Sequence, residues 1–413
     1  MKFAFVSQSL PPSWSGQSTV IYRVLRDLDP SCYCLITQDY GDARAHREKK
    51  EGRLPGKYFY IPRRHAIPRA WRFDFVRRLN IRMRARQIEK IIRREHCEAV
   101  VACPGDFFDL PATMYASQAT GVAFYPYMLD YYSQQSIGFK SGIEARRLEA
   151  EIMKNATGII VPNEFMGEEA RTRYGVRSVT VIRNPCDVAA YEALPAPEPN
   201  SEFKIVYTGS IYNAHFDAFR NLTSAIAKLG RPEVRIHLYT NQSREELERN
   251  GISGSVIIHG ALQASAIPRI QKGADLLFLP LAFNSPFPEL IRTSAPGKTG
   301  EYLAAGRPIL VHAPSDSFLA WYFNRHECGL VVDQSDPEKL AEAINSLLTD
   351  SFLRHKLEAN ALERARSEFS IDVSSAAFSR LLGLKSANQT DAQRMIATDW
   401  LAVYRRQGLE PAP

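Results

Sequence analysis

The stretch TSAPGKTGEYLAAGRPILV, residues 293–311, combines residue types that bind phosphate and hydroxyl groups. Small residues from Ser294 to Gly297 would let an anion approach the backbone, and Lys298 adds a mobile positive charge. A helix is predicted to begin at Lys298, and the unpaired N–H groups of its first turn would attract an anion. Glu301, in the same turn, could accept hydrogen bonds from two sugar or ribose hydroxyls. These residues therefore indicate a site for a phosphorylated ligand that carries hydroxyl groups.

The same stretch also fits one ordinary αβ unit of a parallel sheet. Gly306 would then be a helix C-cap, and Glu301 would be a favourable acid in the first helical turn. The local chemistry gives the two interpretations equal weight. The elements that would position the stretch must decide between them.

The composition limits the class of protein. A chain of 413 residues with a 45% apolar fraction is long enough for two to three domains with real cores. The six cysteines are scattered and contain no CxxC, so neither a disulfide framework nor a zinc site is expected, and the compartment should be reducing. No apolar run has the length that a membrane span requires, and the N-terminus looks like a first strand instead of a signal peptide. We therefore expect a cytoplasmic protein.

Short apolar runs alternate with helical patterns along the whole chain, which is typical of α/β domains. Prolines at every second position in ALPAPEPNSEF predict an extended linker at residues 193–203. We predict a Rossmann-like domain at residues 1–192, a second at residues 204–385, and a terminal helix within residues 386–413 that docks on the body. With two such domains, the natural site is the cleft between them, at the carboxyl ends of the strands.

The individual elements can be predicted from the same pattern. Most of the apolar runs are continuous, as in strands that are buried on both faces. Strands are expected at residues 2–6, 33–37, 57–61, 99–103, 122–125, 158–161, 179–182, 204–208, 234–239, 256–259, 275–279, 308–311 and 329–332. Helices are expected at residues 20–28, 74–94, 141–156, 217–229, 244–249, 266–272, 298–305, 337–348 and 351–369.

Positive charge is concentrated in one part of the first domain. Residues 41–100 contain 18 Lys and Arg against 7 Asp and Glu, whereas the whole chain has a net charge of +7. Aromatic residues are interleaved with this charge, so residues 60–95 could rest on an anionic membrane face. The alternative is a solvated helix face with its apolar side turned to the core. Nucleic acid is not expected as a partner, because no nucleic-acid motif accompanies the charge.

Several segments, in their order and spacing, resemble the GT-B glycosyltransferases, and in particular the retaining family-4 group. PGKTGEYLAAGRPIL at residues 296–310 is similar to the donor loop of that family. Four further segments match in order: VIRNPCD (181–187), KIVYTGSIY (204–212), VIIHGAL (256–262) and ADLLFLPL (274–281). The resemblance implies two Rossmann-like, doubly wound domains that face each other across a cleft, with a C-terminal crossover helix.

The resemblance also implies an activity. A hexosyltransferase of this type would move a sugar from a nucleotide-diphosphate donor to a hydroxyl of a glycan or lipid-linked acceptor, with retention, in surface polysaccharide synthesis. It would need neither a cofactor nor a metal, because helix dipole and basic residues can stabilise the departing diphosphate. A lipid-linked acceptor, together with the basic residues 60–95, implies that the enzyme binds peripherally to the inner face of the membrane.

Roles for single residues follow from the same resemblance. Glu301 would bind the ribose. The remaining donor-binding candidates would contact or admit the diphosphate: Gly16, Gly209, Ser210, Ser294, Gly297 and Lys298. Asp130 is a candidate catalytic carboxylate in the cleft, although an aspartate that caps a turn at a strand end is at least as common.

The sequence departs from the family pattern at three places. The family often has a glutamate eight residues before the one matched by Glu301, where Thr293 stands here, and a histidine where Leu129 stands. It often has an Arg and a Lys after the glycine of YTGS, where the nearest basic residues are His215 and Arg220. Two alternatives therefore stay open: a catalytically silent binding or scaffold subunit, and a sugar-nucleotide epimerase on the same fold. A NAD-dependent oxidoreductase is not favoured, because no G-x-G-x-x-G follows a predicted strand.

Overall fold

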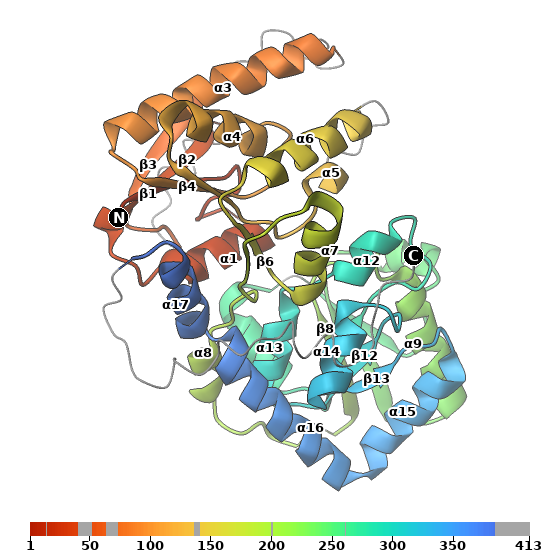
Figure 1. Ribbon diagram of the computed structural model, residues 1–413. Coiled ribbons are helices and arrows are strands. Elements are labelled where there is room, and N and C mark those ends of the chain that lie inside the picture. The colour runs from red at the N-terminus through yellow and green to blue at the C-terminus, as the bar shows by residue number, and fades with distance from the viewer. Residues whose placement is uncertain are drawn as a thin grey trace.

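The computed structural model describes residues 1–13, 15–39, 52–62, 73–135, 141–199, 201–260 and 262–384. They form two α/β units, one above the other in Figure 1, and each unit is built on a parallel sheet. Among these residues, no helix combines the length and the apolar character that crossing a bilayer demands.

The first unit contains a five-stranded parallel sheet in the order β3-β2-β1-β4-β5. Its strands are β1 (Phe3–Val6), β2 (Tyr33–Asp39), β3 (Lys57–Pro62), β4 (Ala99–Ala102) and β5 (Ala123–Pro126). β1 and β4 are fully buried, as their continuous apolar sequences predict. The strand order reverses between β1 and β4, and open α/β sheets bind ligands beyond the carboxyl ends of the strands at such a point.

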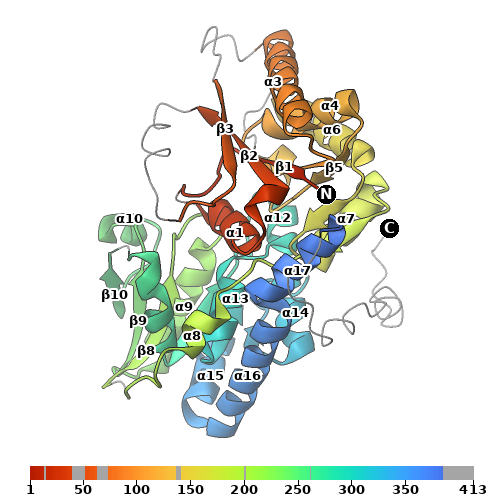
Figure 2. The same ribbon diagram turned by 90° about the vertical axis from the view of Figure 1, so that its left-hand side faces the viewer.

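Helices and a small second sheet complete this unit. A two-stranded parallel sheet, β6 (Ile159–Val161) and β7 (Val179–Val181), joins the end of β5 through a bridge between Tyr127 and Ile160. The helices are α1 (Gly16–Leu25), α3 (Asp74–Arg94), α4 (Asp109–Thr120), α5 (Tyr132–Gln135), α6 (Ser141–Asn155) and α7 (Glu164–Tyr174). Figure 2 shows α3 at the end of the molecule farthest from the second unit.

The second unit contains a six-stranded parallel sheet in the order β10-β9-β8-β11-β12-β13. Its strands are β8 (Phe203–Thr208), β9 (Val234–Tyr239), β10 (Val256–His259), β11 (Leu276–Pro280), β12 (Ile309–His312) and β13 (Leu330–Val332). Its helices are α9 (Phe216–Leu229), α10 (Arg244–Arg249), α11 (Ile267–Lys272), α12 (Pro288–Thr293), α13 (Lys298–Ala305), α14 (Phe318–His326), α15 (Pro337–Thr349) and α16 (Ser351–Arg364). Here the order reverses between β8 and β11, so the turn after β8 and the loops after β11 flank the expected ligand position.

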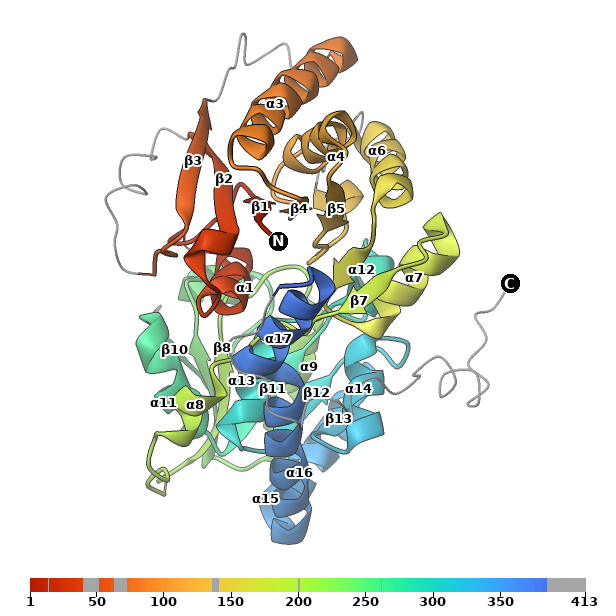
Figure 3. The same cartoon turned by 60° about the vertical axis from the view of Figure 1, so that its left-hand side comes forward.

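The chain crosses between the units at different residues than the proline pattern predicts. Cys186, Val188 and Tyr191 pack in the core of the second unit, so the chain already enters it with α8 (Val188–Glu192), ahead of the proline-rich residues. A π-helical turn at Ala365–Phe369 leads to α17 (Ile371–Leu381), which returns to the first unit beside α1 (Figure 3). The Phe378 ring lies 5.6 Å from the Phe3 ring, centroid to centroid. The crossover helix is therefore α17, and the helix expected within residues 386–413 lies outside the described residues.

Every predicted strand is present, with ends within two residues of the prediction. Several helices were not predicted, among them α4, α7, α14 and α17. α4 shows the reason, because eight of its residues are buried and the helix has no alternation of apolar and polar faces for a pattern to reveal. α1 begins four residues earlier than predicted, where the Ser15 side chain accepts a hydrogen bond from the Ser18 N–H.

Candidate active site

The loop that leads into α13 is anchored by the first domain. The Asn163 side chain donates to the Thr293 carbonyl at 2.8 Å, and the Asn184 side chain donates to the Ala295 carbonyl at 2.8 Å. Both asparagines lie before the second sheet in the chain, so the two domains jointly fix the loop. Gly297, at the N-cap of α13, is exposed and supplies no side-chain cap. The Thr299 N–H donates to the Pro296 carbonyl at 2.9 Å, and the other N–H groups of the first turn have no side-chain cap and can receive an anion.

The turn after β8 meets this helix start at Lys298. The Lys298 ammonium lies 3.2 Å from the Tyr207 hydroxyl, which in turn donates to the Ser210 carbonyl at 2.8 Å. Gly209 has a φ of +122°, and a Cβ there would lie 3.2 Å from Lys298 Nζ. Only glycine allows this backbone conformation together with this close approach. The structure thus brings Gly209, Ser210 and Lys298 together at the reversal of the strand order.

Asp130 approaches the same place from the first domain. The residue has exposed surface, but protein atoms packed around its carboxyl group reduce the hydration of that group and raise its pKa to about 6. The pKa of Tyr212 is also raised, by burial first, while Lys298 lowers it and Asp130 raises it. Tyr212 therefore lies within electrostatic range of both charges. Asp130 is therefore close enough to the turn after β8 to act on Tyr212 electrostatically.

His215, one of the two basic residues nearest the glycine of YTGS, is buried in the structure. It is 5% exposed, and its ring packs against Tyr212 with centroids 4.5 Å apart. Burial, with a smaller contribution from Lys298, lowers its pKa to about 3. The imidazole is therefore neutral at physiological pH and adds no positive charge beside Lys298.

Glu301 faces the first domain across the interface. Its Oε1 accepts from Arg23 Nη2 of α1 at 3.1 Å, and its Oε2 lies 3.4 Å from Gln271 Nε2. The carboxylate is thus held between the two domains, in the first turn of α13, by groups from α1 and α11. The sequence did not point to Arg23 or Gln271, because neither belongs to a motif and each comes from a distant element.

The other predicted residues lie at the edges of this site. Gly16 is exposed in the first turn of α1, and no described atom lies within 4 Å of where its Cβ would be. Ser294 is half-buried after α12. Thr293, where the family often has a glutamate, is 1% exposed. Glu289 does not replace that glutamate, because it is paired with Arg173 at 3.1 Å.

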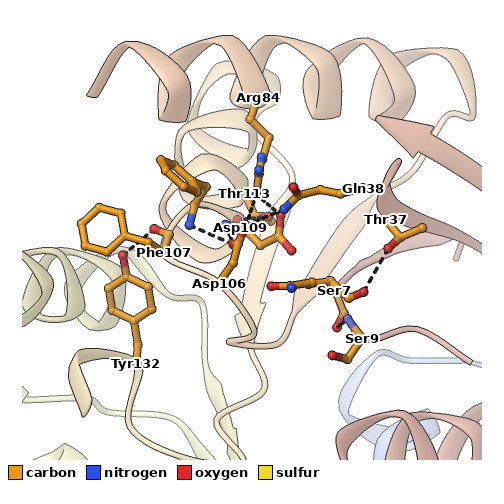
Figure 4. Close-up of polar contacts among 12 residues, drawn as sticks. Ser7, Ser9, Thr37, Gln38, Arg84, Asp106, Phe107, Asp109, Thr113 and Tyr132 are labelled. Carbon is orange, nitrogen blue, oxygen red and sulfur yellow. Dashed lines mark hydrogen bonds and ion pairs between the residues drawn. The ribbon is translucent and has the colours of Figure 1, made fainter. Parts of the chain in front are cut away.

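A second polar cluster lies at the strand-order reversal of the first domain (Figure 4). Arg84 of α3 lies 2.7 Å from Asp106 Oδ2 and 2.6 Å from Asp109 Oδ1. Gln38, at the end of β2, donates to the same Asp106 oxygen. Burial and the neighbouring Asp106 raise the pKa of Asp109 to about 7, against the opposing effect of Arg84. Within this cluster, Arg84 forms ion pairs with both carboxylates. Asp106 also accepts hydrogen bonds from two backbone N–H groups at the start of α4.

In the described part of the chain, no group of three or more His, Cys, Asp or Glu side chains could hold a metal ion. All six cysteines are free.

Comparisons with known proteins agree with the architecture. The family model described as "Glycosyltransferase Family 4" matches residues 14–190, and the model described as "Glycosyl transferases group 1" matches residues 202–350. The two matches fall on separate domains and together span most of the chain. No curated protein matches the chain by sequence.

Solved structures with the same two-domain fold are similar over nearly their whole length. HepE from Anabaena, in complex with UDP, has a TM-score of 0.65 and 16% identity, covering 93% of this chain and 100% of that one. Sucrose-phosphate synthase from Thermosynechococcus elongatus has a TM-score of 0.65 and 15% identity, covering 92% and 98%. The lipopolysaccharide outer core galactosyltransferase WaaB, in its apo form, has a TM-score of 0.64 and 14% identity, covering 93% and 99%. With a glycosyltransferase model on each domain and this fold, the chain belongs to the glycosyltransferases of the GT-B fold.

Proposed function

We propose that this glycosyltransferase takes its sugar from a nucleotide-diphosphate donor held by the second domain and transfers it to an acceptor hydroxyl presented by the first domain. The observation that carries the proposal is the convergence of Lys298, Gly209 and the start of α13 at the strand-order reversal. A diphosphate placed there would meet an ammonium group, backbone N–H groups and the positive end of a helix. The UDP complex of the structurally similar HepE supports a donor of this class.

The proposed reaction needs positioning and charge stabilisation from the protein. As the sugar–phosphate bond breaks, negative charge grows on the departing diphosphate, and Lys298 with the α13 N–H groups would stabilise it. In the retaining scheme that we propose, the diphosphate itself takes the proton of the acceptor hydroxyl. Asp130, with its pKa of about 6, is ionised at pH 7 and would orient that hydroxyl by accepting its hydrogen bond.

Donor binding can be tested by a thermal-shift panel of UDP-, GDP- and ADP-sugars, followed by calorimetry with the best ligand. We expect one base to raise the melting temperature clearly. Glu301→Ala should then lower the affinity by about 10- to 100-fold, since a hydrogen bond to a charged group contributes about 1.5–3 kcal/mol. An unchanged affinity would remove Glu301 from the donor site.

A catalytically silent binding subunit is the second candidate. Thr293 in place of the common glutamate and Leu129 in place of the common histidine favour it. The two candidates differ in one readout, which is release of nucleotide diphosphate from a bound donor in the presence of acceptor glycans or of water. Tight donor binding without any release would favour the silent subunit.

We further propose that α3 holds the enzyme against an anionic lipid surface, which would suit a lipid-linked acceptor in surface glycan synthesis and a cytoplasmic, membrane-peripheral location. Helical spacing places one stripe along the exposed side of α3: Phe75, Arg78, Leu79, Arg82, Arg86, Lys90 and Arg93. The apolar members lie at the helix start, where Phe75 is 70% exposed and Leu79 is 54% exposed. Arginine-rich helices with exposed apolar residues bind the headgroup region of anionic membranes.

Vesicle sedimentation at low salt tests the membrane proposal. Vesicles with phosphatidylglycerol should retain the protein, and neutral phosphatidylcholine vesicles should not. The double variant Arg82→Glu, Arg86→Glu should abolish retention, whereas Lys228→Glu, on the second domain, should not change it. Equal retention by phosphatidylglycerol and phosphatidylcholine vesicles would contradict the proposal.

A further inference from the structure

We propose that Arg23 is a positioning residue for Glu301, so that the first domain orients the carboxylate that receives the donor ribose. The inference rests on the proposed function, because it takes Glu301 as the ribose-binding residue. Arg23 lies on α1, outside every motif of the donor domain.

The contacts of Arg23 fix its guanidinium between the domains. Its Nη1 donates to the Pro185 carbonyl at 2.8 Å, and its Nη2 lies 3.1 Å from Glu301 Oε1. The side chains of Arg23 and Glu301 are 21% and 22% exposed, so water only partly screens the pair. Because the guanidinium is a rigid planar fork, the carbonyl contact also sets the direction from which Glu301 is held.

The second carboxylate oxygen faces an equally fixed donor. Gln271 Nε2 donates to Thr208 Oγ1 at 2.8 Å and lies 3.4 Å from Glu301 Oε2. The Tyr191 hydroxyl donates to the other end of this amide, and Gln271 is fully buried. A carboxylate has about four lone-pair positions, so two contacts leave room for the two hydroxyls of a ribose. The arrangement orients Glu301 without filling its accepting capacity.

Other residues besides Arg23 dock α1 on its neighbours. One turn further along, Arg26 Nη1 binds Asp187 Oδ2 at 2.8 Å, and Ser375 of α17 donates to the Val24 carbonyl at 2.9 Å. Arg26 thus offers a matched control. It is a cation at the C-terminal end of the same helix, it binds Asp187, two residues from the Pro185 carbonyl that Arg23 binds, and it makes no hydrogen bond or ion pair with Glu301 in the structure. Its loss tests docking alone, whereas the loss of Arg23 tests the orientation of Glu301.

The test is calorimetry with a nucleoside diphosphate and its 2′-deoxy counterpart, for UDP, GDP and ADP. We expect the wild type to prefer the ribose form. Arg23→Met should lower the affinity for the ribose form about tenfold and change the affinity for the deoxy form much less, so that the preference collapses. Arg26→Met should keep the wild-type preference. Arg23→Lys should restore part of it, because an ammonium can still pair with Glu301.

The outcomes separate this inference from the function on which it rests. If Arg23→Met keeps the wild-type preference for ribose, or if Arg23→Met and Arg26→Met weaken both ligands equally, Arg23 does not position Glu301 and the donor proposal stands. If the wild type binds none of the three nucleoside diphosphates, both proposals are overturned. Thermal unfolding of each variant, with Arg23→Lys as the conservative change, shows whether a lost affinity reflects lost folding.

Discussion

The two domains place polar groups at equivalent points of their sheets but balance the charge in opposite ways. At the reversal in the first domain, Arg84 is matched by Asp106 and Asp109, which also begin α4. At the reversal in the second domain, Lys298 contacts a neutral tyrosine, and no salt bridge joins it to a carboxylate within the described ranges. One cluster neutralises its own charges, whereas Lys298 has no carboxylate partner among the described residues, as a site for the proposed anionic ligand requires. The same topology therefore supports a structural centre or a binding site, depending on the local charge balance.

The largest expected effect is the loss of unfolding free energy when Arg84 is removed from the first-domain cluster. Arg84→Met leaves two largely buried carboxylates without their cation, and breaking a buried pair in this way costs about 3–5 kcal/mol of unfolding free energy. Urea unfolding measures the loss, with the exposed Arg82→Met on the same helix as the control. A loss below about 1 kcal/mol would mean that the cluster is solvated and that the contrast between the domains fails.

Removing the cation of the second domain should act on binding instead of stability. Lys298→Met should lower the affinity for a nucleoside diphosphate by about 10- to 100-fold, because a charge-assisted contact to phosphate is lost. Lys228→Met is the matched control, since that lysine pairs with Glu338 at 2.9 Å on the exposed surface. Calorimetry measures the affinity of both variants for the nucleoside diphosphate. If Lys298→Met binds it as tightly as Lys228→Met does, the diphosphate does not bind at Lys298.

Gly209→Ala tests whether the turn after β8 contributes to nucleotide binding as well as to stability. At a φ of +122° an alanine is strained by at least about 1 kcal/mol, and its methyl group would press on Lys298. We expect lower stability and weaker nucleotide binding together. Gly230→Ala, at a φ of +63° with nothing within 4 Å of the added carbon, should lower stability alone. If the two variants bind nucleotide equally well, Gly209 has no role beyond its turn.

The smallest effect concerns pH. Since burial raises the pKa of Asp130 to about 6, the carboxylate is ionised above that pH and protonated below it. Transfer activity that uses the ionised form should fall as the pH decreases through about 6. Asp130→Asn should remove this acidic limb from the profile of kcat/KM between pH 5 and 8. An acidic limb that survives the substitution belongs to another group.

The sequence predicted the parts of this molecule that depend on local pattern. The strands were predictable because buried parallel strands are continuous apolar runs, and the α13 loop was predictable because glycine, lysine and glutamate follow one another at a helix start. The partners of these residues were not, since Arg23 reaches Glu301 from 278 positions away. α17 was missed as the crossover helix because its docking is decided by contacts such as that between Phe378 and Phe3. Neutral His215 was missed because burial, which sets its pKa, follows from tertiary packing.

The most direct test of the central claim is amide hydrogen exchange with and without a saturating nucleoside diphosphate. If a diphosphate binds between the turn after β8 and the start of α13, peptides that cover residues 208–211 and 294–301 should exchange more slowly in its presence. Peptides around the Arg84 cluster should not change. Binding that protects neither of the two segments of the second domain would contradict the account.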